Sequence, residues 1–510
     1  MICKVRSGAV AGVTGFPVIV EVDISSGMPA FDIVGLPDSA IKESRERVRA
    51  AITNSGMAFP VKRIIVNLAP ADTRKEGPAF DLPIAIGILA CMGAVRQAAL
   101  EKVFVTGELS LSGDIAPVVG VLPMAHEAAV SGLSVFAAPA DNAEEAALVG
   151  DMSVIPVKDL RELVDFLNGT PISPLTVDAN ALFNAEASDT LSDFADVKGQ
   201  ENVKRALEVA AAGRHNAILI GPPGAGKTML AKRVPTILPD LSFDESIEVT
   251  KIYSVSGLLG SRNSLVTRRP FRAPHHTVSY AALTGGGRVP KPGEISLAHN
   301  GVLFLDELPE FHRPTLEVLR QPLEEGSVTI ARVGGTITYP SDFMLIASMN
   351  PCPCGFFGES GKCGCNMNAI ARYLGKVSGP LLDRIDIQVE APRVDYADLG
   401  SSRKGEPSAN IKERVSRAAA IQRERYKGSI TRCNAGLSAA EIDIHCKLDP
   451  SGRELITRAF DKMGMSARAY HKILKVARTI ADLAQSENIS VMHLAEAIQY
   501  RSLDRKYWKG

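Results

Sequence analysis

The sequence predicts an α/β fold in three parts, with a mixed α+β domain first, a parallel-sheet core in the middle and a helical domain last. The chain has 510 residues, more than the roughly 250–300 at which a single hydrophobic core stops growing. Its central part alternates short β-rich runs with helical stretches, a pattern typical of parallel sheets flanked by helices. From about residue 405 onward, apolar residues recur at helical spacing.

Composition narrows the class of protein. The hydrophobic fraction of 45% and the charged fraction of 22% are ordinary for globular domains. Lys and Arg number 57, as do Asp and Glu, so any binding to nucleic acid has to come from local basic patches. No apolar run reaches the ~18 residues of a membrane span, and the start MICKVRSGAVAGVTG lacks a secretory signal pattern. We therefore expect a cytoplasmic protein without a membrane partner.

The first domain is predicted to occupy residues 1–170. The runs PVIVEVDI and VKRIIVNLAP have the apolar pattern of half-buried strands, and SAIKESRERVRAAITNSG has the charged faces of an exposed helix. Residues 171–194 are polar and lack periodicity, so they are predicted to form a linker without regular structure. The core is then expected to cover 195–395, and the helical domain 396–510.

A phosphate-binding loop follows an apolar run in the core. The stretch AILIGPPGAGKTML fits the pattern G-x-x-x-x-G-K-[ST] between a strand and a helix, which is the context this motif needs. Its glycines let backbone N–H groups approach phosphate oxygens, Lys227 would reach the β- and γ-phosphates, and Thr228 would ligate Mg²⁺. The predicted ATP-binding residues of the loop are Gly221, Pro222, Pro223, Gly224, Ala225, Gly226, Lys227 and Thr228.

Two later strand ends carry polar residues that suit hydrolysis. The run GVLFLDELPEF offers Asp306, placed to join the Mg²⁺ shell, and Glu307, placed to orient and deprotonate water. The run DFMLIASMN ends in Asn350, which could hold the attacking water or sense the γ-phosphate. The alternative for each is an ordinary buried strand with solvated polar residues at its end. A pair of acids behind a phosphate loop favours turnover over a nucleotide-gated scaffold.

In their order along the chain, these motifs resemble those of AAA+ ATPases, and nearly the whole chain resembles the magnesium-chelatase-like ComM/YifB family. PLLDRIDI supplies Arg384, and SARAYHKILKVARTIADL supplies Arg468. The resemblance implies that Arg384 is an arginine finger inserted into the neighbouring subunit's site. It implies that Arg468 is a second sensor that contacts the γ-phosphate from a helical lid. It also implies a homo-oligomeric ring, a hexamer.

The first domain resembles the proteolytic domain of Lon in the stretches RKEGPAFDLPIAIGILA and VTGELSLSGDIAPVVGVLPMAHEAAVSGLSVFAAP. In this chain Ala79 stands at the position of the nucleophilic serine, and Leu122 at that of the lysine base. Without a hydroxyl to attack or an amine to take its proton, the Ser-Lys mechanism lacks both of its catalytic groups. We therefore expect a scaffold or a nucleic-acid platform, and no protease.

Two segments of the core are candidates for contact with DNA. Residues 268–301 are rich in Gly, Pro and His and resemble the helix-2 insert of magnesium chelatases, a pore-side loop; a subunit-interface loop is the alternative. SVTIARVGGTITYPSDF has the pattern of a hairpin and resembles the pre-sensor hairpin of the same ATPases, with Arg332 near its tip. Basic residues of the insert that suit phosphate backbones are Arg268, Arg269, Arg272, His275, His276, Arg288 and Lys291.

Four of the eight cysteines follow Asn350, in ASMNPCPCGFFGESGKCGC. Cys352, Cys354, Cys363 and Cys365 form the pattern C-x-C-x₈-C-x-C, in which four thiolates can converge tetrahedrally on structural Zn²⁺. Such a clip would brace the irregular segment behind Asn350. Reduced thiols without a ligand and a redox-active disulfide pair are the alternatives. Catalytic zinc is disfavoured, because four cysteines leave no open coordination position.

The sequence thus supports two functional hypotheses. The first is an ATP-driven ring motor on single-stranded or branched DNA, and the family resemblance implies branch migration during recombination of incoming DNA in natural transformation. The second is a chelatase-type or chaperone-like ATPase that remodels a protein partner, which the resemblance to magnesium chelatase and the neutral overall charge support. ATP, Mg²⁺ and structural Zn²⁺ are the expected cofactors.

Overall fold

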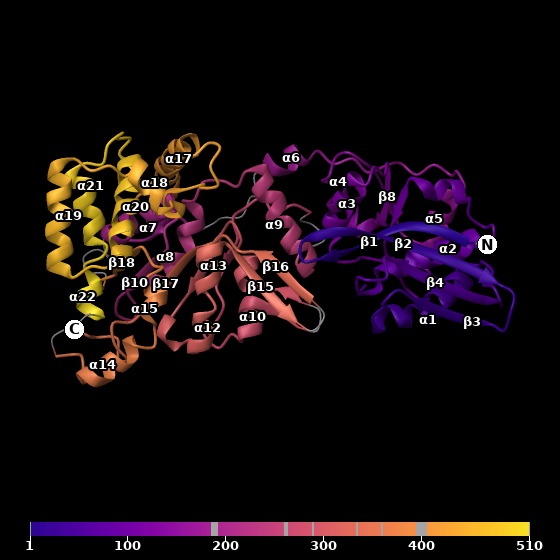
Figure 1. Cartoon of the computed structure of the whole chain (residues 1–510), viewed down its shortest axis with the longest axis horizontal. Helices are drawn as coiled ribbons and strands as arrows, with labels where there is room; N and C mark the ends of the chain where they lie inside the picture. Colours follow the sequence, from indigo (N-terminus) through magenta and orange to yellow (C-terminus); the bar gives the residue numbers. More distant parts are fainter. Residues whose placement is uncertain are drawn as a thin grey trace.

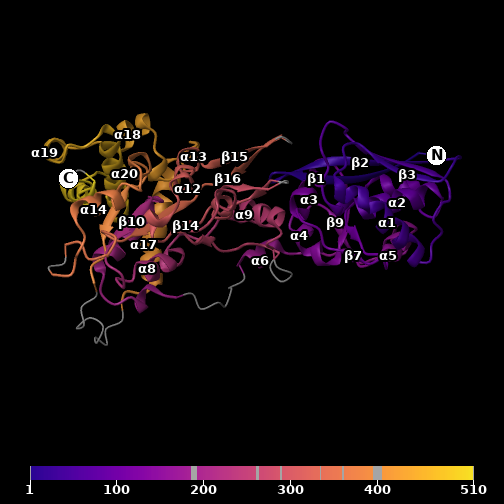
Figure 2. The same cartoon turned by 90° about the horizontal axis from the view of Figure 1, so that it is seen from below.

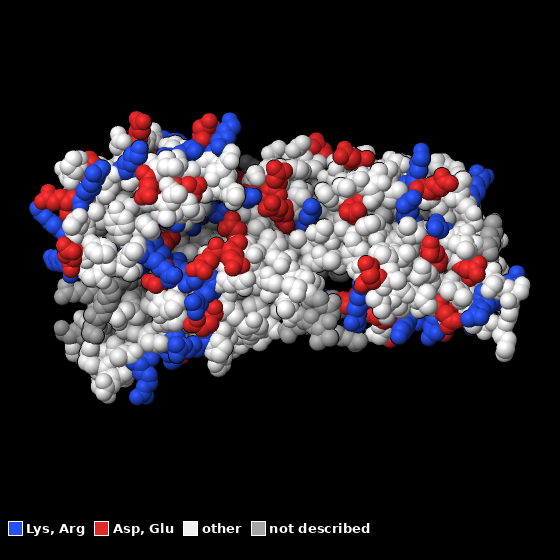
Figure 3. Space-filling view, viewed as in Figure 1, with Lys and Arg blue, Asp and Glu red and all other residues white. Residues whose placement is uncertain are grey.

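The computed structural model describes residues 2–184, 192–259, 264–287, 290–332, 335–358, 361–393 and 405–508. The molecule is elongated, with the amino-terminal sheet at one end, the α/β core in the middle and the carboxyl-terminal helices at the other end (Figure 1). A view from below shows the same order (Figure 2). Positive and negative side chains are interspersed over the face in Figure 3, in keeping with the balanced composition. Within the described ranges, no helix is long and apolar enough to cross a bilayer.

The amino-terminal domain is built on a seven-stranded mixed sheet. Side chains alternate along its first strand, so that Cys3 and Val5 are buried while Lys4 and Arg6 are exposed. From edge to edge the strands are β3 (Ala30–Val34), β4 (Arg63–Ala69), β2 (Thr14–Ser25), β1 (Ile2–Ala11), β5 (Val103–Val105), β8 (Val135–Pro139) and β9 (Ser153–Val157). A two-stranded pair joins β6 (Glu108–Leu109) to β7 (Ile115–Ala116). Helices of this domain are α1 (Ser39–Asn54), α2 (Asp81–Cys91), α3 (Val121–Val130), α4 (Ala143–Ala147) and α5 (Leu160–Leu167).

The core is a five-stranded sheet in which all strands run parallel. Its order is β11 (Phe271–Arg272), β14 (Val302–Leu305), β17 (Met344–Met349), β10 (Ala217–Ile220) and β18 (Ile387–Glu390). Alternate residues of β10 enter two different apolar clusters, so both faces of the sheet are covered. Because the strands are parallel, their carboxyl ends share one edge of the sheet, here called the carboxyl edge, and their amino ends share the amino edge. The predicted α/β class with a parallel core sheet is confirmed.

Helices and short pairs of strands surround the core sheet. The two antiparallel pairs are β12 (Gly285–Gly286) with β13 (Lys291–Pro292), and β15 (Ser327–Arg332) with β16 (Gly335–Pro340). The second pair is the predicted hairpin, although residues 333–334 lie outside the described ranges. The helices are α7 (Glu201–Gly213), α8 (Lys227–Arg233), α9 (Phe243–Ser256), α10 (Tyr280–Thr284), α11 (Glu294–Leu297), α12 (Arg313–Glu317), α13 (Arg320–Glu325), α14 (Met367–Leu374) and α15 (Gly379–Leu382).

The carboxyl-terminal part is helical, as the sequence predicts, and is called the lid below. Its helices are α17 (Ser408–Arg425), α18 (Ala439–His445), α19 (Pro450–Met463), α20 (Ala467–Leu483), α21 (Val491–Gln499) and α22 (Leu503–Tyr507). The apolar residues of α20, among them Ile473, Leu474 and Ala477, are buried together on one face. They belong to the same apolar cluster as α7, so the lid and the core share one hydrophobic core.

A buried polar network also ties the lid to the amino edge of the core sheet. His215 lies just before β10 and is fully buried; its Nδ1 is 3.1 Å from Oδ2 of Asp386, and its Nε2 is 2.7 Å from Oγ1 of Thr479 on α20. Nζ of Lys472, also on α20, is 2.9 Å from Oδ1 of Asp386. Burial by itself would raise the pKa of Asp386, but Lys472 and His215 together lower it below its ordinary value. The lowered pKa keeps the carboxylate of Asp386 ionised between Lys472 of the lid and His215 of the core.

The segment predicted as an unstructured linker contains a helix, α6 (Ala179–Asn184). Asp178 accepts a hydrogen bond from the N–H of Ala181 at 2.9 Å, which caps the helix start. The ring of Phe183 meets Phe243 at the start of α9 edge-on, with centroids 5.9 Å apart. Local capping and one aromatic contact thus support a helix in a segment whose polar composition predicts no regular structure.

The amino-terminal domain contacts the core through α3 and α9, which lie beside each other in Figure 1. Glu145 is buried at this contact, where it accepts hydrogen bonds from the N–H of Leu122 (2.9 Å) and from the hydroxyl of Ser254 on α9. Gly12, in the turn between β1 and β2, approaches Ile337 of the β15–β16 hairpin so closely that a Cβ would lie 3.1 Å from it. Leu122 shares a small apolar cluster with Leu265 of the core, so it also takes part in the contact between the domains.

Candidate active site

The predicted phosphate loop joins β10 to α8 at the carboxyl edge of the core sheet. Gly226 precedes α8 with a φ of 79°, in the left-handed region that favours glycine. Gly221 has no room for a side chain, since a Cβ there would lie 2.1 Å from the carbonyl oxygen of Ala391. Both positions therefore require glycine, and the bare backbone of the loop can approach a phosphate group closely.

Lys227 connects the loop to the neighbouring strand β17. Its Nζ donates hydrogen bonds to the carbonyl oxygens of Gly221 (2.7 Å) and Pro222 (3.0 Å) and to Oδ1 of Asn350 (3.2 Å). Asn350 directly follows β17, which pairs with β10. The structure therefore brings the predicted lysine and the predicted sensor asparagine into direct contact.

The two predicted acids lie next to the loop. Oδ2 of Asp306 accepts a hydrogen bond from Oγ1 of Thr228 at 2.6 Å, and Oδ1 accepts one from the hydroxyl of Ser348. Glu307 has a φ of 52°, which is uncommon for a residue with a side chain, and its N–H donates to Oδ1 of Asp306 at 3.0 Å. Burial lowers the pKa of Lys227, and the charges of Asp306 and Glu307 partly offset this effect. The arrangement combines a cation, a hydroxyl and two carboxylates at one sheet edge.

Ser348 is a residue of the site that the sequence analysis missed. Leu305 of β14 pairs with Ala347 of β17, so the next step of the same register brings Asp306 level with Ser348. Ser348 is fully buried, and its hydroxyl orients the carboxylate. The available signal was a hydroxyl residue within the otherwise apolar run MLIASM, on the strand next to the acids.

His276 has a different environment from the one that the sequence predicts. It is expected to belong to a basic patch for DNA, but its Nδ1 lies 3.6 Å from Oε2 of Glu307. Its ring also meets Phe311 edge-on, with centroids 6.4 Å apart. The imidazole therefore contacts the side chain that is predicted to activate water.

Arg384 lies at the amino edge, away from the phosphate loop of its own chain. Its carbonyl oxygen accepts a hydrogen bond from Nδ2 of Asn216 at 3.1 Å, and Asn216 precedes β10 whereas the loop follows it. The Arg384 side chain is only 10% exposed. It donates to the carbonyl oxygens of Arg320 (3.2 Å) and Pro380 (2.5 Å) and pairs with the carboxylate of Glu324.

Arg468 lies near Arg384. It stands in the first turn of α20, its side chain is 66% exposed, and its Nη1 is 3.6 Å from Oδ2 of Asp383, the residue before Arg384. Nζ of Lys472, one turn further along α20, donates to the carbonyl oxygen of Ile385 at 3.1 Å. The described contacts thus place both predicted arginines at the edge of the sheet opposite to the phosphate loop.

Two of the basic residues of the predicted insert are engaged within the chain. Arg269 donates to the carbonyl oxygens of Pro239 and Asn300 and pairs with Glu245. Arg272 pairs with both carboxylate oxygens of Glu294, at 2.6 and 2.7 Å. These two arginines anchor the segment, and they are poorly placed for DNA.

The remaining basic residues differ in how they are placed. Lys291 and His275 are exposed, and Arg268 is partly exposed. Arg288 and the side chain of Arg332 lie outside the described residues. The predicted DNA contacts at these positions therefore stay predictions.

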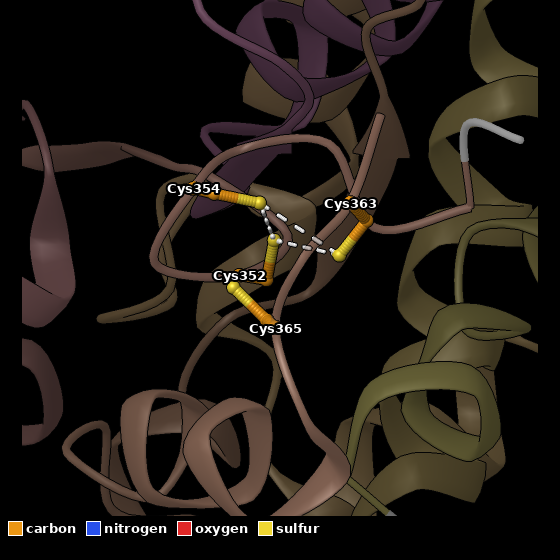
Figure 4. Close-up of side chains that lie close together, drawn as sticks. All are labelled: Cys352, Cys354, Cys363 and Cys365. Atoms are coloured by element: carbon orange, nitrogen blue, oxygen red, sulfur yellow. Dashed lines mark hydrogen bonds between the residues drawn. The ribbon is translucent and has the colours of Figure 1, made fainter. Parts of the chain in front are cut away.

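The four cysteines after β17 converge. Their Sγ atoms all lie within 4.8 Å of one another, and Cys352 Sγ is 3.4 Å from that of Cys354 and 3.9 Å from that of Cys363 (Figure 4). Four thiolates at ~2.3 Å from a tetrahedral zinc would lie about 3.8 Å apart, so this spacing is compatible with a structural metal. The cluster also touches the phosphate loop, since a Cβ on Gly355 would lie 2.4 Å from Cδ of Pro223.

Comparison with known proteins shows similarity over nearly the whole chain. This chain is 46% identical over 506 residues to the competence protein ComM of Haemophilus influenzae, covering 98% of this chain and 97% of that protein. It is 44% identical over 507 residues to the uncharacterized protein YifB of Escherichia coli, with the same coverage. The magnesium-chelatase 67 kDa subunit of Chlorobaculum tepidum is 27% identical over 160 residues, which are 31% of this chain and 23% of that subunit.

Three family models also match. Residues 193–399 match magnesium chelatase, subunit ChlI; residues 20–142 match subunit ChlI of Mg-chelatase; and residues 405–501 match the C-terminal part of magnesium chelatase, subunit ChlI. The first match covers the phosphate loop, both acids, Asn350, the four cysteines and Arg384.

Proposed function

Because the chain belongs to the ComM/YifB family of magnesium-chelatase-like AAA+ proteins, we propose that it hydrolyses ATP between the subunits of a ring and uses the cycle to move DNA. The contact that carries this proposal is the 2.6 Å hydrogen bond from Thr228 to Asp306, which joins the phosphate loop to the acidic strand end, with Glu307 next in the chain. A phosphate cradle linked in this way to a pair of acids suits hydrolysis of a bound triphosphate.

Each residue of the cradle has a proposed task. The backbone of the loop binds the phosphate groups, and Lys227 exchanges its hydrogen bonds to Gly221 and Pro222 for phosphate oxygens. Glu307 orients a water molecule and accepts its proton, while Asn350 holds that water in line with the γ-phosphate. The hydrogen bond from Lys227 to Asn350 at 3.2 Å supports this division, because it sets the sensor beside the group that holds the phosphate.

Mg²⁺ fits the donor set of this site. Oγ1 of Thr228 and Oδ2 of Asp306 are hard oxygen ligands only 2.6 Å apart, and oxygen ligands are the type that Mg²⁺ prefers. When bound, Mg²⁺ neutralises charge on the β- and γ-phosphate oxygens. Ser348 would keep the Asp306 carboxylate oriented toward the ion through its own hydrogen bond.

The second half of each catalytic centre is proposed to come from a neighbouring subunit. Arg384 and Arg468 both lie near the amino edge, so neither reaches the loop of its own chain in this arrangement. In a head-to-tail ring the amino edge of one subunit can face the carboxyl edge of the next. We propose a hexamer in which Arg384 leaves Glu324 and stabilises the transition state in the neighbour, with Arg468 contacting the γ-phosphate beside it.

We propose that the four cysteines hold a structural Zn²⁺. The proposal is supported by the convergence of their sulfur atoms, whose spacing is compatible with a tetrahedral tetrathiolate site. Because Gly355 of the same segment packs against Pro223, the ion would brace the phosphate loop as well as the chain after Asn350.

DNA is the proposed cargo, and branch migration of recombining strands is the proposed task. The support comes from the relative in Haemophilus influenzae, which is named a competence protein, and from the exposed Lys291 in the insert. The alternative is a chelatase-type or chaperone-like ATPase that remodels a protein. One observation favours that alternative: Arg269 and Arg272, two predicted DNA contacts, form ion pairs within the chain.

The catalytic proposal is tested with Glu307→Gln. This variant should bind ATP as tightly as the wild type and lose turnover, measured by fluorescence of a labelled ATP analogue and by phosphate release. Glu310→Gln is the matched control, because Glu310 is exposed three residues further on and pairs with Lys376 at 3.2 Å; it should retain turnover. Unchanged hydrolysis by Glu307→Gln would exclude the assigned role.

The cargo is tested with the same assay in the presence of single-stranded and forked DNA. A DNA-driven motor should show stimulated turnover that falls steeply as salt rises, because contacts to phosphates release counterions. Turnover that is indifferent to both DNA forms would favour the protein remodeller.

A further inference from the structure

A cleft between the core and the lid takes no part in the proposed catalytic cycle. It encloses about 350 Å³, which is within the range of sites that bind small molecules. Its floor is the amino edge of the core sheet, where Gly301 precedes β14 and Met344 begins β17. One side is formed by α9 of the core, and the other by α17 of the lid with the loop that follows it. The phosphate loop lies at the opposite edge of the sheet, so the cleft is separate from the nucleotide site.

The inner part of the cleft is apolar. Leu238 and Met344 are buried side chains of the core, and Ala211 of α7 contributes only a methyl group. Tyr426 of the lid is also buried, and its hydroxyl lies 2.6 Å from Oδ1 of Asn434, so its polar end is already satisfied within the lid. An apolar group of a ligand would therefore leave water favourably in this part of the cleft.

Two arginines on the lid side of the cleft are unpaired. Arg423 lies in the last turn of α17 and Arg432 in the loop after it, and both are exposed. Within the described ranges, neither forms an ion pair or a hydrogen bond. Arg269, which also lines the cleft, is by contrast paired with Glu245 and donates to main-chain carbonyl oxygens. Because guanidinium groups with free N–H donors suit carboxylates, the lid side is suited to an anionic group.

Arg214 adds a third guanidinium at the floor of the cleft. Its Nη1 lies 3.1 Å from Oδ2 of Asp342, and its Nη2 donates to the main-chain oxygen of the same residue at 3.3 Å. A guanidinium has five N–H donors, so donors are left for a further acceptor. Arg214 also ends α7 with a φ of 57°, a conformation in which glycine would be less strained. A strained arginine at such a position points to a use for its side chain.

The α9 side of the cleft is acidic. Asp244 is exposed in the first turn of the helix, and its carboxylate has no ion pair or hydrogen bond within the described part of the chain. Glu248, one turn further on, is 46% exposed; its Oε2 lies 3.3 Å from Nε2 of His299 and accepts from Nδ2 of Asn300 at 3.2 Å. The hydrogen bond with His299 lowers the pKa of Glu248, and the charge of Arg432 on the lid side contributes. The acidic and basic sides are thus close enough to act on one ligand.

We propose that this cleft binds a small zwitterion of the amino-acid class with an apolar side chain. Its carboxylate pairs with Arg423, Arg432 and Arg214, its ammonium group pairs with Asp244 and Glu248, and its side chain lies in the apolar part. A simple anion would face the acids of α9, and a simple cation would face the arginines, so a molecule with both charges suits the cleft best. The inference goes beyond the proposed function, because it does not depend on ATP hydrolysis.

The test uses L-phenylalanine as the probe, added to the full chain without nucleotide and followed by isothermal titration calorimetry. Two analogues of nearly the same size separate the charges: 3-phenylpropionate lacks the ammonium group, and 2-phenylethylamine lacks the carboxylate. Phenylalanine should bind about tenfold more tightly than either analogue, because each analogue loses two or more partly exposed ion pairs.

Three variants test whether the probe binds in the cleft. Arg432→Gln should weaken the binding of phenylalanine about three- to fivefold, the size expected for one partly exposed ion pair, and should not weaken the binding of 2-phenylethylamine. Ala419→Phe should prevent binding by filling the cleft, which Ala419 lines from α17 as a partly exposed residue. Arg417→Gln is the matched control, because Arg417 is exposed on the same helix and does not line the cleft; it should bind phenylalanine as the wild type does.

A second measurement locates the probe in the wild-type protein. Cys433 lines the cleft, and burial raises the pKa of its thiol, so iodoacetamide should alkylate it slowly. Bound phenylalanine should slow this reaction further, as measured by mass spectrometry of the peptides. Cys91, a partly exposed thiol of the amino-terminal domain, is the internal control and should react at the same rate with and without phenylalanine.

The proposal would be overturned if phenylalanine did not bind at millimolar concentration, or if it bound no more tightly than both analogues. Binding that survives Ala419→Phe, or that leaves the alkylation of Cys433 unchanged, would also overturn it, because the probe would then bind elsewhere. None of these results depends on turnover, so failure of this proposal is distinguishable from failure of the catalytic one.

Discussion

Replacing Arg384 with Ala should abolish turnover although the phosphate loop is intact, because the arginine acts in another subunit. The carbonyl oxygen of Arg384 lies beside Asn216 at the amino end of β10, and the loop begins at Gly221. An extended strand rises ~3.3 Å per residue, so these ends are about 16 Å apart. This span is longer than an arginine side chain. Arginine fingers contribute roughly 10³- to 10⁵-fold to turnover in GTPases, and we expect a loss of that order.

A mixing experiment measures the sharing directly. Arg384→Ala keeps an intact loop, and Lys227→Ala keeps an intact arginine, so each variant alone should be inactive. In rings assembled at random from equal amounts, about one quarter of the interfaces combine an intact loop with an intact arginine. The mixture should therefore recover about a quarter of the wild-type rate if each interface works independently.

The assay is phosphate release per subunit over a dilution series, with native mass spectrometry to count subunits and to verify mixed rings. Glu324→Gln is an informative companion, because it removes the carboxylate that pairs with Arg384 within its own chain. Full activity of Arg384→Ala would refute the shared centre. The shared centre would also be refuted if the rate per subunit did not fall on dilution to concentrations at which the ring dissociates, or if mixed rings recovered no activity.

Two further predictions concern stability and metal content. Asp386→Ala should lower the free energy of unfolding by about 3–5 kcal/mol in urea titrations, because it leaves Lys472 buried without its partner. The pKa of Asp386 is lowered in the folded protein, so its contribution to stability is complete above its ordinary pKa of 3.8 and is lost as pH falls further. The difference in free energy of unfolding between wild type and variant should therefore shrink in acid, and a constant difference would contradict this account. Cys363→Ser should reduce bound zinc from about one equivalent to below half by elemental analysis, whereas Cys433→Ser, outside the cluster, should not. Wild-type protein purified reduced and without chelator that holds less than half an equivalent would exclude the zinc clip.

The convergence of the candidate site's residues could be predicted because it depends on local pattern and on one general rule. The glycines of GPPGAGKT, the acids after VLFL and the asparagine after MLIASM each follow a short apolar run. Parallel strands end at the same edge of a sheet, so three strand ends sufficed to expect Lys227, Asp306 and Asn350 together. The cysteine cluster was predictable for a similar reason, because the spacing of its two pairs already limits where the sulfur atoms can go.

The ion-pair partners of the charged side chains could not be predicted in the same way. Arg269 and Arg272 have the composition of a DNA-binding patch, but their partners Glu245 and Glu294 lie more than twenty residues away in each direction of the chain. A charged side chain pairs with whatever the fold sets beside it, and an isolated sequence segment does not contain that information. The contact between His276 and Glu307 was missed for the same reason, because these two residues are far apart in the chain and only the fold brings them together.

By itself the sequence determined the fold class, the phosphate loop, the acids that face it and the likeness to the ComM/YifB family, because each depends on residues close together in the chain. Only the tertiary structure decided that Arg384 and the phosphate loop lie at opposite edges of one sheet. The cause is strand direction: a residue just before β18 and a residue just after β10 are separated by the full length of the parallel strands, however similar their motifs look in sequence.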